Sequence, residues 1–136
     1  MPQNLPKQVI VVRTDLVMPM GKLGAQISHA SEAPVYNQMT KSGDVRTLIT
    51  KEGSALQLWL DGPFVKIILG CKSLDKLLKL AEDVKARNIP VAIIKDAGYT
   101  VFTEPTITCI GIGPCFPEEI DDLTKRFQTL KSYKFE

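Results

Sequence analysis

The chain has 136 residues, of which 44% are hydrophobic and 24% are charged, and its formal net charge is +2. This length supports one domain (residues 1–136) with a sizeable core, and the composition is that of an ordinary globular protein. No apolar run approaches the roughly 18 residues that cross a bilayer, and residues 1–7 lack the pattern of a secretory signal, so we expect no membrane association.

The first half of the chain predicts one strand and two helices. Residues 8–14 are a short β-branched run that predicts a central strand. A helix is expected to open just after Gly21, and Pro34, which has no amide hydrogen, is expected to kink or end it. Residues 45–60 carry apolar residues at helical spacing, weakened by Gly53, and predict a second helix.

The second half predicts three more strands and two more helices. The apolar runs at residues 64–69, 89–95 and 106–111 predict buried strands. Ser73 is a suitable N-cap for one helix, and Pro117 opens the last one. The expected buried face of the last helix consists of Ile120, Leu123, Phe127 and Leu130.

The predicted order is therefore strand, helix, helix, strand, helix, strand, strand, helix. Helical crossovers make the first two strand connections parallel. The roughly ten-residue link between the last two strands fits an antiparallel return. We predict a single three-layer α/β domain whose four-stranded mixed, mostly parallel sheet has helices on both faces.

Charge is polarised along the chain. Residues 66–95 contain seven basic and three acidic residues, whereas residues 96–122 contain six acidic residues and no basic ones. This pattern fits a basic face that binds nucleic acid. It fits equally well a solvated helix flank followed by acidic residues that match a helix dipole.

The three cysteines argue for a reducing environment. Cys71, Cys109 and Cys115 are odd in number and show no pairing pattern, so we expect free thiols in a cytoplasmic protein. Cys109 lies in a predicted strand and is expected to be a small buried hydrophobe. A single histidine without a C-x-x-C pair argues against a structural zinc site, and we expect no cofactor.

Two distant polar segments are predicted to meet. Lys22, Gln26 and His29 share one face of the first predicted helix. Asp96 follows the apolar run 91–94 and therefore lies where a buried strand ends, which is where open α/β sheets bind ligands. A cation, an amide and a carboxylate brought together there suit a reaction that develops negative charge on oxygen.

Four segments carry a family resemblance. They are VVRTDL (11–16), MGKLGAQISHA (20–30), IIKDAGYT (93–100) and TCIGIGP (108–114). In order and spacing, from about residue 8 to the end, they resemble the archaeal/eukaryotic-type peptidyl-tRNA hydrolases. The resemblance implies a homodimeric enzyme that cleaves the ester between a peptide and the 3′ end of tRNA by metal-independent attack of water.

The resemblance assigns catalytic roles to three residues. Asp96 would orient or deprotonate water, although Asp-Ala-Gly is also a good turn sequence whose carboxylate could bond only its own backbone. Lys22 would stabilise the oxyanion or hold the terminal phosphate of tRNA. The alternative is that Lys22 is only a solvated charge at the start of a helix. Thr100 would offer a hydroxyl at the same point.

Three further residues are expected to bind substrate. Gln26 can donate and accept hydrogen bonds, which suits positioning of the peptide or of water. Thr108 belongs to the family pattern, although strand threonines are common for β-propensity alone. His29 could act as a base, but a structural hydrogen-bonding role is favoured.

The sequence departs from the family pattern in two places. Residues 63–66 read Pro-Phe-Val-Lys where relatives often show Gly-Gln-Pro-Lys, and Glu104 introduces a carboxylate that would repel phosphate near the expected site. These departures motivate an alternative, a catalytically weakened family member that binds tRNA or a protein. A third hypothesis is an esterase for another aminoacyl-tRNA.

Overall fold

The strand β1 (Lys7–Arg13) lies at the centre of the structure, because its β-branched residues are buried on both faces. The structure is a computed structural model, and it describes residues 4–133. After β1 the elements are α1 (Met20–Tyr36), β2 (Thr40–Ser42), β3 (Val45–Thr47), α2 (Ala55–Leu60), β4 (Lys66–Cys71), α3 (Leu74–Ala86), β5 (Val91–Asp96), β6 (Thr106–Cys115), α4 (Pro117–Thr124) and β7 (Gln128–Thr129). None of the described helices has the length and apolar character that a membrane crossing requires.

The main sheet has five strands in the order β5-β6-β1-β4-β7, and β2 and β3 form a separate two-stranded sheet. The predicted mixed sheet is therefore present, but the predicted count of four strands is wrong. Strands β1, β4 and β5 run in one direction, as the helical crossovers predicted. Because the antiparallel strand β6 lies between β1 and β5, only β1 and β4 are parallel neighbours, so the sheet is not mostly parallel in its pairing.

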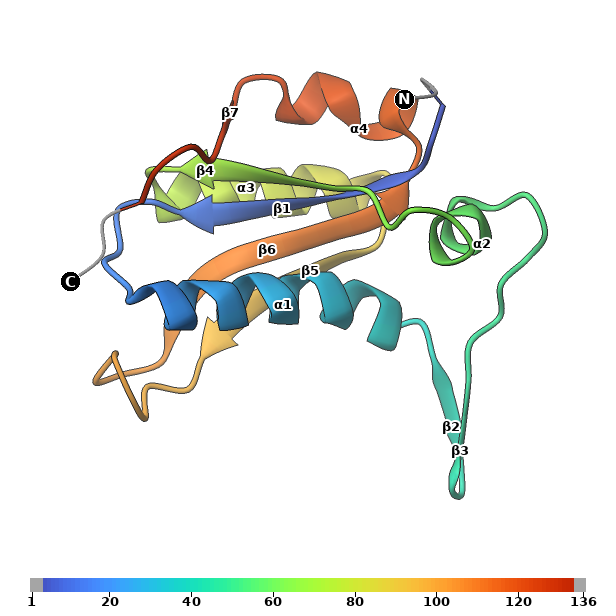
Figure 1. The fold of residues 1–136 in the computed structure, drawn as a ribbon, viewed down its shortest axis with the longest axis horizontal. Coiled ribbons are helices and arrows are strands. Elements are labelled where there is room, and N and C mark those ends of the chain that lie inside the picture. Colours follow the sequence, from blue (N-terminus) through green and yellow to red (C-terminus); the bar gives the residue numbers. More distant parts are fainter. Residues whose placement is uncertain (1–3, 134–136) are drawn as a thin grey trace.

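Helix α1 lies on one side of this sheet and α3 and α4 lie on the other (Figure 1), and each side has an apolar core. On one face, Val9 and Val11 of β1 pack with residues of α3 and α4. On the other face, Ile10 and Val12 pack with residues of α1. Side chains alternate between the faces of a strand, so β1 contributes to both cores. The predicted arrangement of helices on both faces is thus observed.

Helix α1 lies unusually close to β6. A Cβ atom built on Gly111 would lie 1.7 Å from the carbonyl oxygen of Ala30, so only glycine permits this approach. Pro34 cannot donate the helical hydrogen bond to that same carbonyl. The helix nevertheless continues to Tyr36, two residues beyond the proline at which a kink or an end was expected.

The prediction of one helix over residues 45–60 is wrong for most of that range. Residues 40–47 form the β2–β3 hairpin, which projects away from the main sheet in Figure 1. Gly43 (φ +59°) turns the hairpin, and Gly53 (φ +83°) precedes α2. The helix itself begins only after Ser54, whose hydroxyl accepts a hydrogen bond from the amide of Gln57 at 3.2 Å.

The later helices begin where the sequence predicted. The Ser73 hydroxyl caps α3 by accepting a hydrogen bond from the amide of Lys76 at 3.3 Å, and α4 begins at Pro117. However, α4 ends at Thr124 rather than continuing through Leu130. The chain instead adds the short strand β7 beside β4.

Candidate active site

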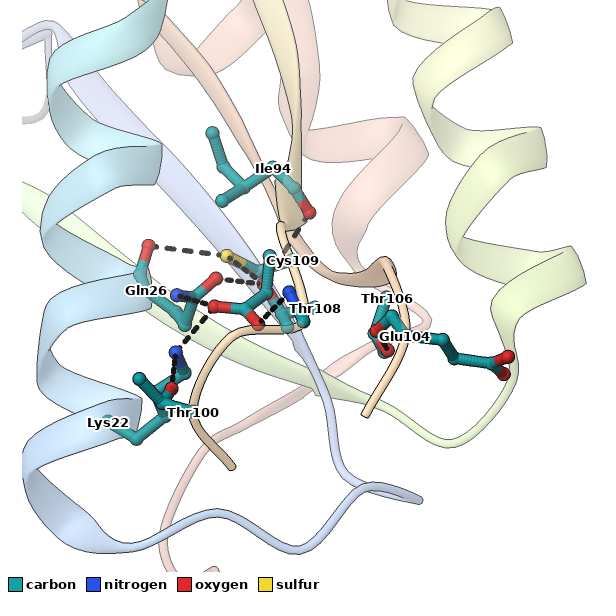
Figure 2. A network of polar contacts seen from close by, with 10 residues as sticks. Lys22, Gln26, Ile94, Thr100, Glu104, Thr106, Thr108 and Cys109 are labelled. Carbon is teal, nitrogen blue, oxygen red and sulfur yellow. Dashed lines mark hydrogen bonds and ion pairs between the residues drawn. The ribbon is translucent and has the colours of Figure 1, made fainter. Parts of the chain in front are cut away.

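Lys22 and Asp96 meet at the carboxyl end of β5. The Lys22 Nζ donates a hydrogen bond to Asp96 Oδ1 at 2.5 Å and another to Thr100 Oγ1 at 2.9 Å. Figure 2 shows the ends of the Lys22 and Thr100 side chains pointing toward each other, from α1 and from the loop that follows β5. The side chain of Lys22 is 17% exposed and that of Asp96 is 9% exposed, so the ion pair is mostly shielded but still open to solvent on one side.

The buried side-chain amide of Gln26 contacts the Asp96 carboxylate of this ion pair. The hydroxyl of Thr108 donates to Gln26 Oε1 at 2.6 Å, and Gln26 Nε2 donates to Asp96 Oδ1 at 3.4 Å (Figure 2). Because its oxygen is occupied by Thr108, the amide must turn its nitrogen toward the carboxylate. Gln26 and Thr108 are both buried, so this orientation is held by groups that water does not reach.

The environment of Asp96 keeps its carboxyl group ionised. The hydrogen bond from Lys22 is the main cause that lowers the pKa of Asp96, and it outweighs the opposing effect of burial. The Gly98 amide, which donates to Oδ2 at 3.0 Å, and the charges of Lys22 and His29 lower this pKa further. The contact with Gly98 is the local turn that the sequence also allowed, so the carboxylate both forms the turn and binds the lysine.

The loop between β5 and β6 is fixed by a close backbone contact. Gly98 has φ +88°, and a Cβ atom at this position would lie 2.5 Å from the carbonyl carbon of Glu104. The backbone oxygen of Glu104 also accepts a hydrogen bond from the Thr106 hydroxyl at 2.9 Å. Figure 2 shows the carboxylate of Glu104 directed away from Lys22 and Gln26. The expected repulsion at the site is therefore reduced by the direction of this side chain.

His29 does not join the network. Its ring is exposed, and within the described part of the chain it makes no hydrogen bond. The expected structural hydrogen-bonding role is therefore not observed. Its connection to the site is electrostatic, through the effect on the pKa of Asp96. The other five predicted residues, Lys22, Gln26, Asp96, Thr100 and Thr108, form one connected set of hydrogen bonds.

Two residues near the site had no predicted role there. Arg13 donates to the Ile107 carbonyl oxygen at 3.1 Å and forms an ion pair with Asp15, and thereby ties the end of β1 to β6. The sequence could have indicated this role of Arg13, because it is a charged residue at the end of a buried strand. Cys109 is buried as expected, and its Sγ also donates to the Gln26 carbonyl oxygen at 3.4 Å.

The chemistry open to this site is limited by two further facts. Burial raises the pKa of Cys109 to about 11, so its thiol stays protonated at neutral pH and is a poor nucleophile. Among residues 4–133, no group of three or more His, Cys, Asp or Glu side chains is placed to hold a metal ion. The remaining reactive groups are an ammonium, a carboxylate, an amide and hydroxyls, which can position water and stabilise an oxyanion.

Comparison with known proteins agrees with the motifs. Residues 6–130 match the family described as peptidyl-tRNA hydrolase PTH2. Over 118 residues, the chain is 42% identical to a peptidyl-tRNA hydrolase of Methanopyrus kandleri, with 87% of this chain and 92% of that relative covered. Proteins of the same description from Sulfurisphaera tokodaii and Haloquadratum walsbyi are 43% and 40% identical, with 87% of this chain and 93% and 94% of those relatives covered.

Proposed function

Because this chain belongs to the PTH2 family of peptidyl-tRNA hydrolases, we propose that Lys22 and Asp96 form the centre of its ester-cleaving site. The chain is a carboxylic-ester hydrolase whose substrate is peptidyl-tRNA. In this reaction the oxygen of water bonds to the ester carbonyl carbon. The bond to the 3′ oxygen of the tRNA then breaks, and that oxygen takes up the proton that the attacking water gives up.

Asp96 orients the attacking water. A carboxylate with a lowered pKa is a weak proton acceptor at neutral pH, so its main contribution is to accept a hydrogen bond from water and hold one lone pair toward the carbonyl carbon. Two donors, Lys22 and the Gly98 amide, hold the carboxylate in place. This fixed geometry lowers the entropic part of the barrier.

Lys22 stabilises the negative charge that develops on the carbonyl oxygen. Its ammonium group has three donors, of which Asp96 and Thr100 accept two. The third donor is free to bind the oxyanion. Helix α1 has no acidic residue in its first turn and no side-chain cap, so the positive end of its dipole adds to the same field.

Gln26 and Thr108 act as positioning residues. The Thr108 hydroxyl fixes the orientation of the Gln26 amide, and that amide donates to the carboxylate. Thr100 holds the other side of the ammonium group. For His29, which is exposed on the next turn of α1, we propose only a role in substrate binding.

The direct contact between Lys22 and Asp96, remote in sequence, is the observation that carries this proposal. The test is a rate measurement with peptidyl-tRNA on the wild type and on Asp96→Ala and Lys22→Ala. Each variant should lower kcat by a factor of about 10² or more while circular dichroism stays unchanged. Asp44→Ala and Lys41→Ala on the hairpin are matched controls that should keep full activity. Undiminished kcat in both site variants would refute the assigned roles.

The same experiment separates hydrolysis from binding alone. Intact ester together with measurable tRNA affinity of the wild type would favour the alternative of a binding module. The departures from the family pattern at residues 63–66 and at Glu104 motivated the binding-module alternative. The Glu104 carboxylate points away from Lys22 and Gln26, which weakens the second of these two reasons.

We also propose the assembly state and the compartment. The chain is proposed to fold as one domain over residues 1–136 and to act as a homodimer, as the family resemblance implies. The cytoplasm is the proposed location, because Cys71, Cys109 and Cys115 are all free thiols. Light scattering on the purified protein tests the dimer, and a mass of one chain at working concentration contradicts it.

A further inference from the structure

A broad groove of about 1320 Å³ lies outside the hydrogen-bonded network just described. Its walls are the ends of β1 and β4, the first turns of α3 and the segment that contains β7. None of the six predicted site residues lines it. Five basic residues do: Lys72, Lys76, Lys79, Arg126 and Lys131.

The groove concentrates positive charge in a chain whose net charge is only +2. Two carboxylates also line it, and one of them, Asp15, is already paired with Arg13. Among the basic residues, Lys79 is paired with Asp83 at 2.8 Å. The other four form no ion pair with any described residue, and all four are exposed. Among the described residues, no carboxylate therefore competes with an external anion for these four residues, and the Arg126 guanidinium also lies 5.1 Å from the centre of the Phe127 ring.

The groove opens at the same edge of the sheet as the catalytic network. Because β1, β4 and β5 run in one direction, their carboxyl ends at Arg13, Cys71 and Asp96 share one edge. Strand spacing of about 4.8 Å puts β4 roughly 14 Å from β5, with β6 and β1 between them. Arg13 lies within this interval, at the end of β1, where it bonds to Asp15 and to Ile107 of β6. A polyanion could thus run from the groove to the ion pair along one edge.

We propose that this groove binds the phosphate backbone of the tRNA while the ester lies between Lys22 and Asp96. The inference rests on the proposed function, because the substrate places a long polyanion next to the reacting ester. Flexible lysines contact phosphates without reading bases, which suits an enzyme whose substrate is defined by its ester. The basic residues at positions 72, 76 and 79 belong to the basic stretch seen in the sequence, so that stretch forms part of a binding surface.

Replacing two lysines at a time by glutamine, which removes their charges, tests this surface. Lys72→Gln/Lys76→Gln removes two groove charges at the start of α3, and Lys41→Gln/Lys85→Gln removes two exposed charges elsewhere. We expect the groove variant to bind uncharged tRNA about tenfold more weakly or worse, with the slope of log Kd against log salt reduced by about 0.7 to 0.9 per lost contact. With peptidyl-tRNA it should raise KM and leave kcat unchanged. The control variant should match the wild type in both assays.

Two results would overturn the inference. One is wild-type affinity and salt slope in the groove variant; the other is an equal loss in both double variants, which would indicate a general effect of net charge. Unfolding is monitored by circular dichroism, and Lys131→Gln, on the opposite wall, provides a second variant away from α3. Failure of the proposed function is distinguishable, because it leaves peptidyl-tRNA intact after incubation with the wild type, whereas tRNA binding is measured without catalysis.

Discussion

Replacing Asp96 by asparagine keeps the shape of the side chain and removes its charge. The structure shows why the amide cannot substitute for the carboxylate. Oδ1 accepts hydrogen bonds from Lys22 and Gln26, and Oδ2 accepts one from the Gly98 amide. An asparagine has only one acceptor oxygen, so its NH₂ group must face either the Gly98 amide or the Lys22 ammonium. Either orientation sets a donor against a donor.

The expected cost follows from these contacts. A hydrogen bond to a charged group contributes about 1.5–3 kcal/mol. Because Lys22 is 17% exposed and water can replace part of its lost contact, we expect Asp96→Asn to lower the free energy of unfolding by about 1–3 kcal/mol. Loss of the water-orienting carboxylate should lower kcat by a factor of about 10²–10⁴ with little change in KM.

Two assays on the same samples check these numbers. Urea denaturation gives the change in unfolding free energy, and single-turnover hydrolysis of peptidyl-tRNA gives the rate of the chemical step. Asp44→Asn is the matched control, because Asp44 is exposed on the β2–β3 hairpin. Retention of the wild-type chemical rate in Asp96→Asn, with the protein folded, would refute the role given to the carboxylate.

Three further predictions concern the same framework. Thr108→Val should leave the buried Gln26 oxygen without a donor, cost about 1–3 kcal/mol in urea denaturation and lower kcat; unchanged values for both contradict the positioning role. Gly111→Ala should press a methyl group onto the Ala30 carbonyl and cost about 1–3 kcal/mol or more, and a wild-type melting temperature would contradict this. Because the pKa of Asp96 is lowered, its pairing should stabilise the fold above about pH 4 and lose that effect as the pH falls further. The stability difference between the wild type and Asp96→Asn should thus shrink only in acid, and shrinkage already at pH 6 argues against the lowered pKa.

Apolar segments with a buried face were predictable, and short exposed ones were not. Strands β1, β5 and β6 are apolar runs, and helix α3 has a periodic apolar stripe, so the sequence identifies all four. Strands β2 and β3 have three residues each, and all six are exposed. Without a buried face they show no alternation. The spacing of the apolar residues Val45, Leu48 and Ile49 resembled that of a helix, but Gly53, which has φ +83°, interrupts the predicted range before α2 begins.

The end of the chain shows a second reason for failure. Phe127 and Leu130 are three residues apart, a spacing typical of one helix face. In the structure Phe127 packs against the core under α3 and α4, and Leu130 packs against the core under α1. An odd spacing along an extended chain puts two side chains on opposite faces of a sheet. Both residues are apolar and partly buried, so the sequence pattern fits one face of a helix as well as the two faces of an extended segment.

The sequence predicted which residues form the site better than it predicted how they contact one another. Helical spacing and the end of an apolar run pointed to Lys22, Gln26 and Asp96. The family resemblance then favoured a site over a simple turn at Asp96 and added Thr100 and Thr108. The order of the contacts was not predictable, because it depends on how closely α1 approaches β5 and β6. His29 follows Gln26 by three residues on the same helix, yet it is exposed and forms none of the hydrogen bonds of the network.

The approach of α1 to β5 and β6 is set by one contact, which lies two turns along α1 from Lys22. Gly111 admits the Ala30 carbonyl to the surface of β6, and the helix upstream of Ala30 then brings Gln26 onto Thr108 of the same strand. The rise of 1.5 Å per residue puts Lys22 a further 6 Å along the axis, level with Asp96 at the end of β5. The distance between ammonium and carboxylate therefore depends on packing at a glycine that touches neither group, so a methyl at position 111 should slow the reaction as well as destabilise the fold.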